Sequence, residues 1–326
     1  MVLDFLKSYK IQLIFFMSFM GFFIFFSPFR DIEDIIFPFN KEVLLLYKNV
    51  SALIVWSRVF ELFVTAILVV SQAILINKLN RKFLILTVNS YLPGVLFILI
   101  SGSLMPLHIV QPILFSGFFL LLTIDQIFSS LKKEKALDVY FNAGLLIFVG
   151  SLFYTGILFY MIVVYAFITY FRSFYWKEWL MPVLGFFCPL AILCGFLYLA
   201  DYTGTFMNNY MLNYRFGLIS FVDIQISFLS IIFYSFITLL LFVSAIYYKN
   251  QKIDSSKYFA SFLLMLILSC LIFLFFESSF IEIIFFLAIP VSYQLSYFLI
   301  NIRKKWLGES IVLIILGLSV AIRFFG

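Results

Sequence analysis

Ten long apolar runs, separated by short polar stretches, constrain the fold of this chain more than any other feature. Their approximate limits are 11–28, 59–77, 83–101, 109–129, 143–170, 179–200, 224–248, 258–276, 281–300 and 308–325. Nearly all have a length of about 17–25 residues, which a helix needs to cross a bilayer and which exceeds the strands of a membrane barrel. A helix satisfies its own backbone hydrogen bonds inside lipid, so the pattern predicts an all-α bundle of membrane helices.

The composition supports the same fold class. Hydrophobic residues make up 64% of the 326 positions and charged residues 12%, whereas a soluble domain has roughly 25% charged residues. A soluble fold of this size has too little interior to cover so much apolar surface. We therefore expect residues 1–326 to form a single integral membrane domain, with the lipid bilayer as its main partner.

The formal net charge of +6 does not indicate binding to nucleic acid, because the basic residues are distributed singly between the apolar runs. That distribution is typical of topology signals. The three cysteines, Cys188, Cys194 and Cys270, lie inside apolar runs and lack the spacing of metal ligands. No nucleic-acid partner and no metal site are predicted.

The run 143–170 is long for one membrane span and short for two. Counting it as two short spans that meet near Tyr154 keeps the basic loops on one side, with 16 of the 22 Lys and Arg inside and six outside. Because basic loops face the cytoplasm, we expect about eleven spans, a cytoplasmic N-terminus and an outer C-terminus. The expected location is the bacterial inner (cytoplasmic) membrane, as a multi-pass protein.

Two longer outer segments, 29–58 and 201–223, are the places where chemistry is expected. The first carries Asp31, Glu33 and Asp34 directly after the first span, and its part 41–57 predicts a helix lying in the membrane interface. The acids fit two interpretations: they hydrate and cap the outer end, or one is a general base whose pKa is raised by partial desolvation near lipid.

Three further polar positions lie on the same expected side. Arg58 and Glu61 are one helical turn apart in the second span, and form either an ion pair or part of a cavity wall. His108, the only histidine, lies on a short turn. Asp125 differs from these three because it lies near the inner end of its span, and it is interpreted as an interfacial residue.

The second outer segment, 201–223, is rich in Asn and Tyr and contains Arg215. Such a surface can hydrogen-bond sugar hydroxyls, stack on sugar rings and hold a phosphate through the arginine. The same composition also fits an aromatic belt at the membrane interface. The sequence leaves both interpretations open.

The layout resembles that of the GT-C superfamily of membrane glycosyltransferases, which use sugars linked to lipid phosphates. The resemblance rests on the acids after the first span, the stretch Asn89–Asp125 with its proline-containing span, and the split run 143–170 followed by Phe171-Arg172-Ser173. It covers about the first 200 residues and depends on layout rather than on a sharp motif.

The resemblance implies that Asp31, Glu33 or Asp34 is the catalytic acid/base, and that Arg58, His108 and Arg215 hold the lipid phosphate. It implies no cofactor beyond a polyprenyl-phosphate-linked donor. The chain departs from the superfamily in lacking a soluble outer domain after the last span, which leaves recognition of the acceptor unexplained and catalysis in question.

A second resemblance is to an uncharacterised multi-pass inner-membrane family of the Bacteroidota. It rests on the stretch 171–182 (Phe-Arg-Ser-Phe-Tyr-Trp-Lys-Glu-Trp-Leu-Met-Pro), with Gly185 and Pro189 following. It implies an inner-membrane location and no particular activity.

Two other functions remain open at this point. The chain fits a non-catalytic membrane subunit of an envelope or secretion assembly, with an envelope protein as partner. It also fits a transporter of a small molecule or lipid, in which Asn80, Asn89, Arg58 and Glu61 line a polar cavity.

Overall fold

The fold was obtained as a computed structural model, which describes most of the chain between residues 12 and 325. The described residues are 12–25, 47, 50, 57–86, 88–103, 110–212, 228–249, 257–275, 280–302 and 304–325. Within these ranges all regular structure is helical, and no strand occurs. The prediction of an all-α fold is therefore confirmed for the part of the chain that is described.

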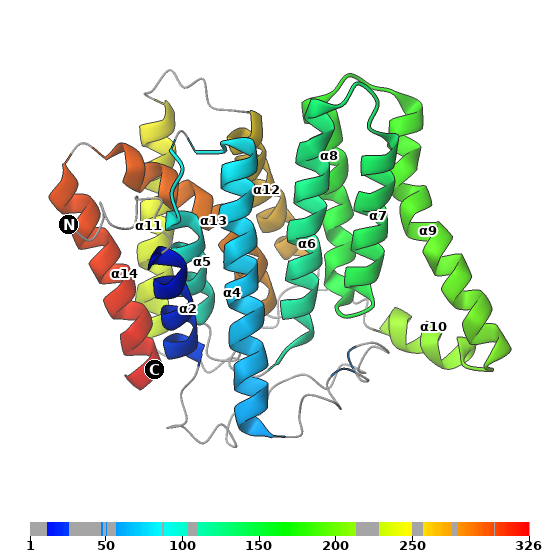
Figure 1. The fold of residues 1–326 in the computed structure, drawn as a ribbon, viewed down its shortest axis with the longest axis horizontal. Helices are drawn as coiled ribbons and strands as arrows, with labels where there is room; N and C mark the ends of the chain where they lie inside the picture. The colour runs from blue at the N-terminus through cyan, green and yellow to red at the C-terminus, as the bar shows by residue number, and fades with distance from the viewer. Residues whose placement is uncertain are drawn as a thin grey trace.

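Twelve α-helices and two short 3₁₀ helices make up the described ranges (Figure 1). The helices are α2 (Gln12–Phe25), α4 (Arg58–Phe83), α5 (Leu92–Gly102), α6 (Pro112–Ser129), η3 (Ser130–Lys132), α7 (Leu137–Ser151), η4 (Thr155–Tyr160), α8 (Met161–Phe171), α9 (Trp176–Leu199), α10 (Thr203–Leu212), α11 (Phe228–Lys249), α12 (Lys257–Phe275), α13 (Phe280–Asn301) and α14 (Lys305–Phe325).

Among the described residues, four segments are long and apolar enough to cross a membrane: Val59–Phe83, Pro112–Lys132, Trp176–Leu199 and Ile284–Asn301. Other apolar helices of the described chain, such as Phe15–Ile24 and Leu229–Ser244, are shorter. Large apolar side chains cover the outside, among them Phe187 and Phe196 on α9. An apolar exterior of this kind fits contact with lipid rather than with water.

The run 143–170 is divided as predicted. Helix α7 ends at Ser151, the chain turns through 152–154, and η4 with α8 returns along α7. In Figure 1, α7 and α8 lie side by side and are joined at one end. The turn is packed rather than loose, because the ring of Phe153 stacks on Phe115 of α6 with centroids 5.0 Å apart.

The run 83–101 does not form one continuous helix, which corrects the sequence prediction for this span. The described residues 84–86 and 88–91 form no helix, and Leu92–Gly102 forms a helix, α5, with every residue buried. Two asparagines of α4 explain this break. Asn80 Oδ1 accepts from the amide of Leu86 (3.0 Å), and its Nδ2 donates to the carbonyls of Val88 and Ser90 (3.4 Å each).

Asn77, one turn earlier on α4, completes the arrangement by capping α5. Its Oδ1 accepts from the amide of Gly94 in the first turn of α5 at 3.0 Å. A Cβ at Gly94 would overlap Asn77 and approach the carbonyl oxygen of Ala73 at 2.7 Å. The glycine therefore allows the start of α5 to lie directly on α4, about two-thirds of the way along that helix.

Helices α6 to α9 pack closely on one another at one side of the molecule, and α9 is its outermost long helix there (Figure 1). Two glycines permit the contact between α7 and α9. A Cβ at Gly144 would overlap the carbonyl of Pro182, and a Cβ at Gly185 would overlap the carbonyl of Phe141. The two backbones thus approach as closely as small residues allow in membrane helix pairs.

Candidate functional site

Most of the predicted site residues lie outside the described part of the chain. Asp31, Glu33, Asp34, His108 and Arg215 belong to this group. Arg58 is described as the first residue of α4, but its side chain is not. The structure does describe residues that flank these positions in the chain, among them Tyr47, Glu61 and Val110.

A junction of three residues, Tyr47, Glu61 and Val110, connects the regions that carry the predicted site. The hydroxyl of Tyr47 donates to the carbonyl oxygen of Val110 at 2.7 Å. The amide of Val110 donates to Glu61 Oε1 at 3.1 Å. Side chains from the first outer segment and from α4 therefore hold the same residue from both sides.

The start of α4 is well fixed, which places Glu61 for this contact. Ser57 caps the helix, accepting from the amide of Phe60 at 3.1 Å. Glu61 lies one turn after Arg58 and in the first turn of the helix, where a carboxylate is favoured by the helix dipole. The sequence suggested either an ion pair with Arg58 or a place in a cavity wall for Glu61. The structure adds a third role, because Glu61 accepts a hydrogen bond from the Val110 amide.

Burial, and secondarily the negative charge of Glu61, raises the pKa of Tyr47 from 10.0 to about 12. The hydroxyl consequently keeps its proton at neutral pH and remains a donor to Val110. Val110 lies two residues after His108 in the sequence, and the junction joins it to Tyr47 and to the beginning of α4.

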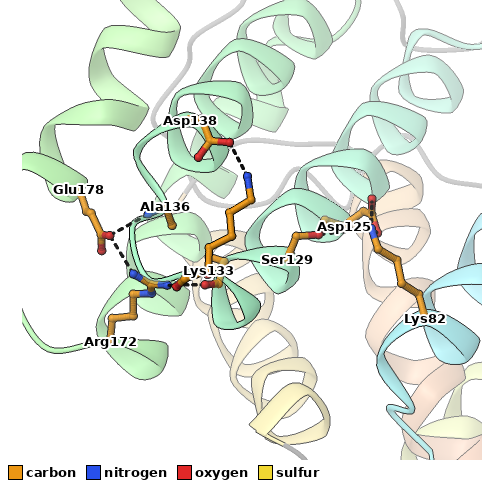
Figure 2. A network of polar contacts seen from close by, with 9 residues as sticks. Lys82, Asp125, Ser129, Lys133, Ala136, Asp138, Arg172 and Glu178 are labelled. Carbon is orange, nitrogen blue, oxygen red and sulfur yellow. Dashed lines mark hydrogen bonds and ion pairs between the residues drawn. The ribbon is translucent and has the colours of Figure 1, made fainter.

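The opposite end of the bundle, here called the basic end, is where α4 and α8 finish and α7, α9 and α12 begin. Its main contact joins Arg172, after α8, to Glu178 in the first turn of α9 at 2.9 Å (Figure 2). The two side chains are only 17% and 5% exposed. Because both are withdrawn from water, each needs the other and further hydrogen bonds to be stable there.

Those further bonds come from the connection between α6 and α7. The Arg172 guanidinium also donates to the carbonyls of Glu134 (2.9 Å), Ser130 and Lys133. Glu178 Oε1 accepts from the amide of Ala136 at 3.1 Å, just before α7 begins. One buried ion pair therefore fixes the α6–α7 connection to the α8–α9 connection.

A second ion pair of the basic end joins α4 to α6. Lys82 Nζ lies 2.7 and 2.9 Å from the two carboxylate oxygens of Asp125, and 3.3 Å from Ser129 Oγ (Figure 2). The interpretation of Asp125 as an interfacial residue fits this position at a helix end. A third pair, between Lys133 and Asp138, is exposed on both sides.

In the second outer segment, Tyr210 has a packing role. The rings of Phe206 and Tyr210 on α10 stack at 5.5 Å and are buried together with Phe148 and Leu152 of the α7 end. The Tyr210 hydroxyl lies 2.8 Å from Ser151 Oγ. This tyrosine is therefore not part of a surface for sugar stacking, while Arg215 lies outside the described residues.

Sequence reasoning missed Tyr47 and Glu178. Tyr47 lay within an apolar helix face, and nothing in the pattern distinguished it. Glu178 stood six residues after Arg172 in a turn between two apolar runs, and opposite charges flanking such a turn were the available signal. Within the described ranges no group of His, Cys, Asp and Glu could hold a metal ion.

No protein-family model, no curated protein and no solved structure matches this chain. Any functional conclusion must therefore come from its residues and their geometry.

Proposed function

We propose that this chain is a multi-pass protein of the bacterial inner membrane that transfers a sugar or related group from a lipid-linked donor at the outer face. Its topology in this proposal has eleven spans and a cytoplasmic N-terminus. The element order supports this count. Eleven elements of the described chain alternate in direction once α10 is set aside and 84–102 is counted as one span.

The junction of Tyr47, Glu61 and Val110 is the observation that carries the transferase proposal. It holds Tyr47, which follows the acids in the sequence, and Glu61 of α4 on the same residue, Val110, two positions after His108. A transferase with its site at this face requires a carboxylate and a cationic phosphate holder to lie close together. The junction makes such an approach possible for Asp31, Glu33 or Asp34 with Arg58 and His108.

In the proposed step, the acceptor hydroxyl oxygen attacks the anomeric carbon of the lipid-linked sugar. The bond between that carbon and the phosphate oxygen breaks, and the lipid phosphate leaves with the electron pair. One of Asp31, Glu33 and Asp34 takes the hydroxyl proton as general base. Arg58, His108 and Arg215 stabilise the departing phosphate through charge-assisted hydrogen bonds.

A transporter receives less support from the geometry. Asn80 and Glu61, two of the residues expected to line its cavity, stand 19 residues apart on one continuous helix, which corresponds to roughly 28 Å. Asn80 is buried and its amide already binds the 84–91 backbone. These two residues cannot line one local substrate cavity.

The test is native mass spectrometry of the protein purified in mild detergent, looking for a retained polyprenyl-phosphate lipid. We expect the lipid to be lost from Arg58→Ala and Arg215→Ala and kept by the control Lys41→Ala, which removes a cation from the same outer segment. Conservative changes at Asp31, Glu33 and Asp34 should then abolish transfer and leave the lipid bound.

A different result would contradict the proposal. Absence of the lipid, together with a protein that co-purifies at fixed stoichiometry, would favour the non-catalytic subunit of an envelope assembly. Full activity in a triple variant lacking all three acids would remove them from the catalytic role.

A further inference from the structure

Three aromatic rings form a fixed apolar floor at the basic end. Phe83 ends α4, Phe128 lies in the last turn of α6, and Tyr258 lies in the first turn of α12. Their ring centroids are 5.0 to 5.5 Å apart in all three pairs. Phe83 and Phe128 are buried, so this floor is set by the packing of three helices.

Two ammonium groups lie over the Phe83 ring, Lys82 Nζ at 4.9 Å and Lys132 Nζ at 5.1 Å from its centroid. Lys82 is already engaged by Asp125 and Ser129. Lys132 Nζ donates one hydrogen bond, to the carbonyl of Lys82 at 3.3 Å, and has no carboxylate partner among the described residues. An ammonium has three donors, so Lys132 keeps two for another ligand.

The basic end carries more lysine charge than carboxylate charge among the described residues. Lys78, Lys135 and Lys257 are exposed, and Lys257 directly precedes Tyr258 of the aromatic floor. Of the nearby carboxylates, Asp125 is paired with Lys82 and Asp138 with Lys133, which leaves the exposed Glu134. The described charges at this end therefore leave a positive excess.

We propose that Lys132, whose ammonium lies over the Phe83 ring, binds the phosphate of an anionic phospholipid, with the exposed Lys257 beside Tyr258 as a second cation. Basic sites between membrane helices near the bilayer surface are suited to anionic headgroups. Exposed apolar side chains also lie on the two helices that carry Lys78 and Lys257, namely Ile67 and Ile74 on α4 and Ile267 and Leu271 on α12, and these helices offer surface to acyl chains. A free phosphate would lack that second contact.

This inference does not depend on the proposed transferase activity, because the site lies at the other end of α4. The test is native mass spectrometry of the full-length protein with phosphatidylglycerol and phosphatidylcholine of the same acyl chains. We expect preferential retention of phosphatidylglycerol. Lys132→Gln should weaken that retention about fivefold, and Lys132→Gln with Lys257→Gln about 25-fold, since each surface lysine contributes a similar factor.

The matched control is Lys177→Gln, which removes an exposed lysine of the same end whose ammonium lies 5.7 Å from the Trp176 ring. It should leave phosphatidylglycerol retention unchanged. Lys132→Arg should keep the preference, which separates loss of charge from loss of fold.

Three results would overturn the proposal. Equal retention of the two lipids would exclude a headgroup site. An equal loss in Lys132→Gln and Lys177→Gln would show only a diffuse positive surface. Displacement of the lipid by millimolar inorganic phosphate would show that a free phosphate, rather than a lipid, is the preferred ligand.

Discussion

The two ends of α4 use charge in opposite ways. At its beginning, Glu61 accepts from the backbone amide of Val110, and Tyr47, whose pKa is raised, donates to the carbonyl of the same residue. At its end, Lys82 and Arg172 belong to networks that join four helices through carboxylates and carbonyls. Ion pairs therefore hold the helices together at the basic end, while the junction is held by hydrogen bonds to Val110.

The largest expected effect concerns Arg172→Ala. Removing the guanidinium leaves the buried Glu178 carboxylate without its counter-charge and three carbonyls without their donor. Breaking a buried ion pair from one side costs about 3–5 kcal/mol. We expect that loss in the free energy of unfolding, measured by denaturant titration in detergent micelles.

Arg172→Lys serves as the partial rescue, since it keeps the charge but loses the fork of donors. If Arg172→Ala unfolds at the same denaturant concentration as the wild type, the ion pair does not hold the two connections together and the contrast between the ends of α4 disappears.

A smaller loss is expected for Gly185→Ala, which tests the packing beneath the basic end. The new Cβ would overlap the carbonyl of Phe141 and force α9 away from α7. Overpacking of this kind costs about 1–3 kcal/mol. The control is Gly195→Ala on the same helix, where nothing lies within 4 Å and the change should be neutral or stabilising, as measured in the same titration.

At the junction, Glu61→Ala should cost about 1–3 kcal/mol, because the Val110 amide loses its acceptor. Glu61→Gln keeps an oxygen in place and should cost less than half as much. Equal losses for the two variants would mean that the negative charge, and not the hydrogen bond, is what matters at this end as well.

Tyr47 makes the junction sensitive to alkaline pH. Its folded pKa of about 12 exceeds the ordinary value of 10.0, so the folded state holds the proton more tightly. The resulting stabilisation is complete below pH 10 and is lost as the pH rises through 12. Tyr47→Phe should cost about 0.5–1.5 kcal/mol at neutral pH.

The check is the difference in unfolding free energy between wild type and Tyr47→Phe, measured from pH 8 upward. The difference should shrink above pH 10, the ordinary pKa in the unfolded chain. A constant difference across this range would show that the tyrosine hydroxyl does not titrate with the folding equilibrium.

The smallest effect is predicted for Asp138→Asn. Both Asp138 and Lys133 are exposed, and exposed pairs contribute at most about 1 kcal/mol and often nothing measurable. Thermal unfolding of this variant should match the wild type. A loss as large as that of Glu61→Ala would place this pair among the contacts that hold the basic end.

The apolar periodicity of the sequence predicted most of the helices to within a few residues, as for 258–276 against α12 (Lys257–Phe275). It also placed the turn near Tyr154, because the basic loops had to remain on one side. It could not predict the irregular stretch 84–91. That conformation depends on Asn77 and Asn80 of the preceding helix satisfying backbone groups that a continuous helix would satisfy itself.

The candidate site was less accessible to sequence reasoning. The charged residues of the predicted site were chosen by residue type and by the expected side of the membrane. The junction depends instead on Tyr47 and Val110, whose side chains gave no sign of a site in the sequence. The carbonyls bound by Arg172 belong to residues 38 to 42 positions away. Such partners follow from the packing of α6 to α9 and are not encoded in any local pattern.

The burial of α5 has a consequence for the order in which the protein is assembled. This short helix, with the irregular backbone before it, is wrapped by α2, α4, α13 and α14. Asn77 and Asn80 of α4 already satisfy backbone groups of this segment and of the start of α5, so α4 and α5 can pair as soon as both have been synthesised. The sides of α5 that meet α13 and α14 are covered only after those helices, near the far end of the chain, have been made.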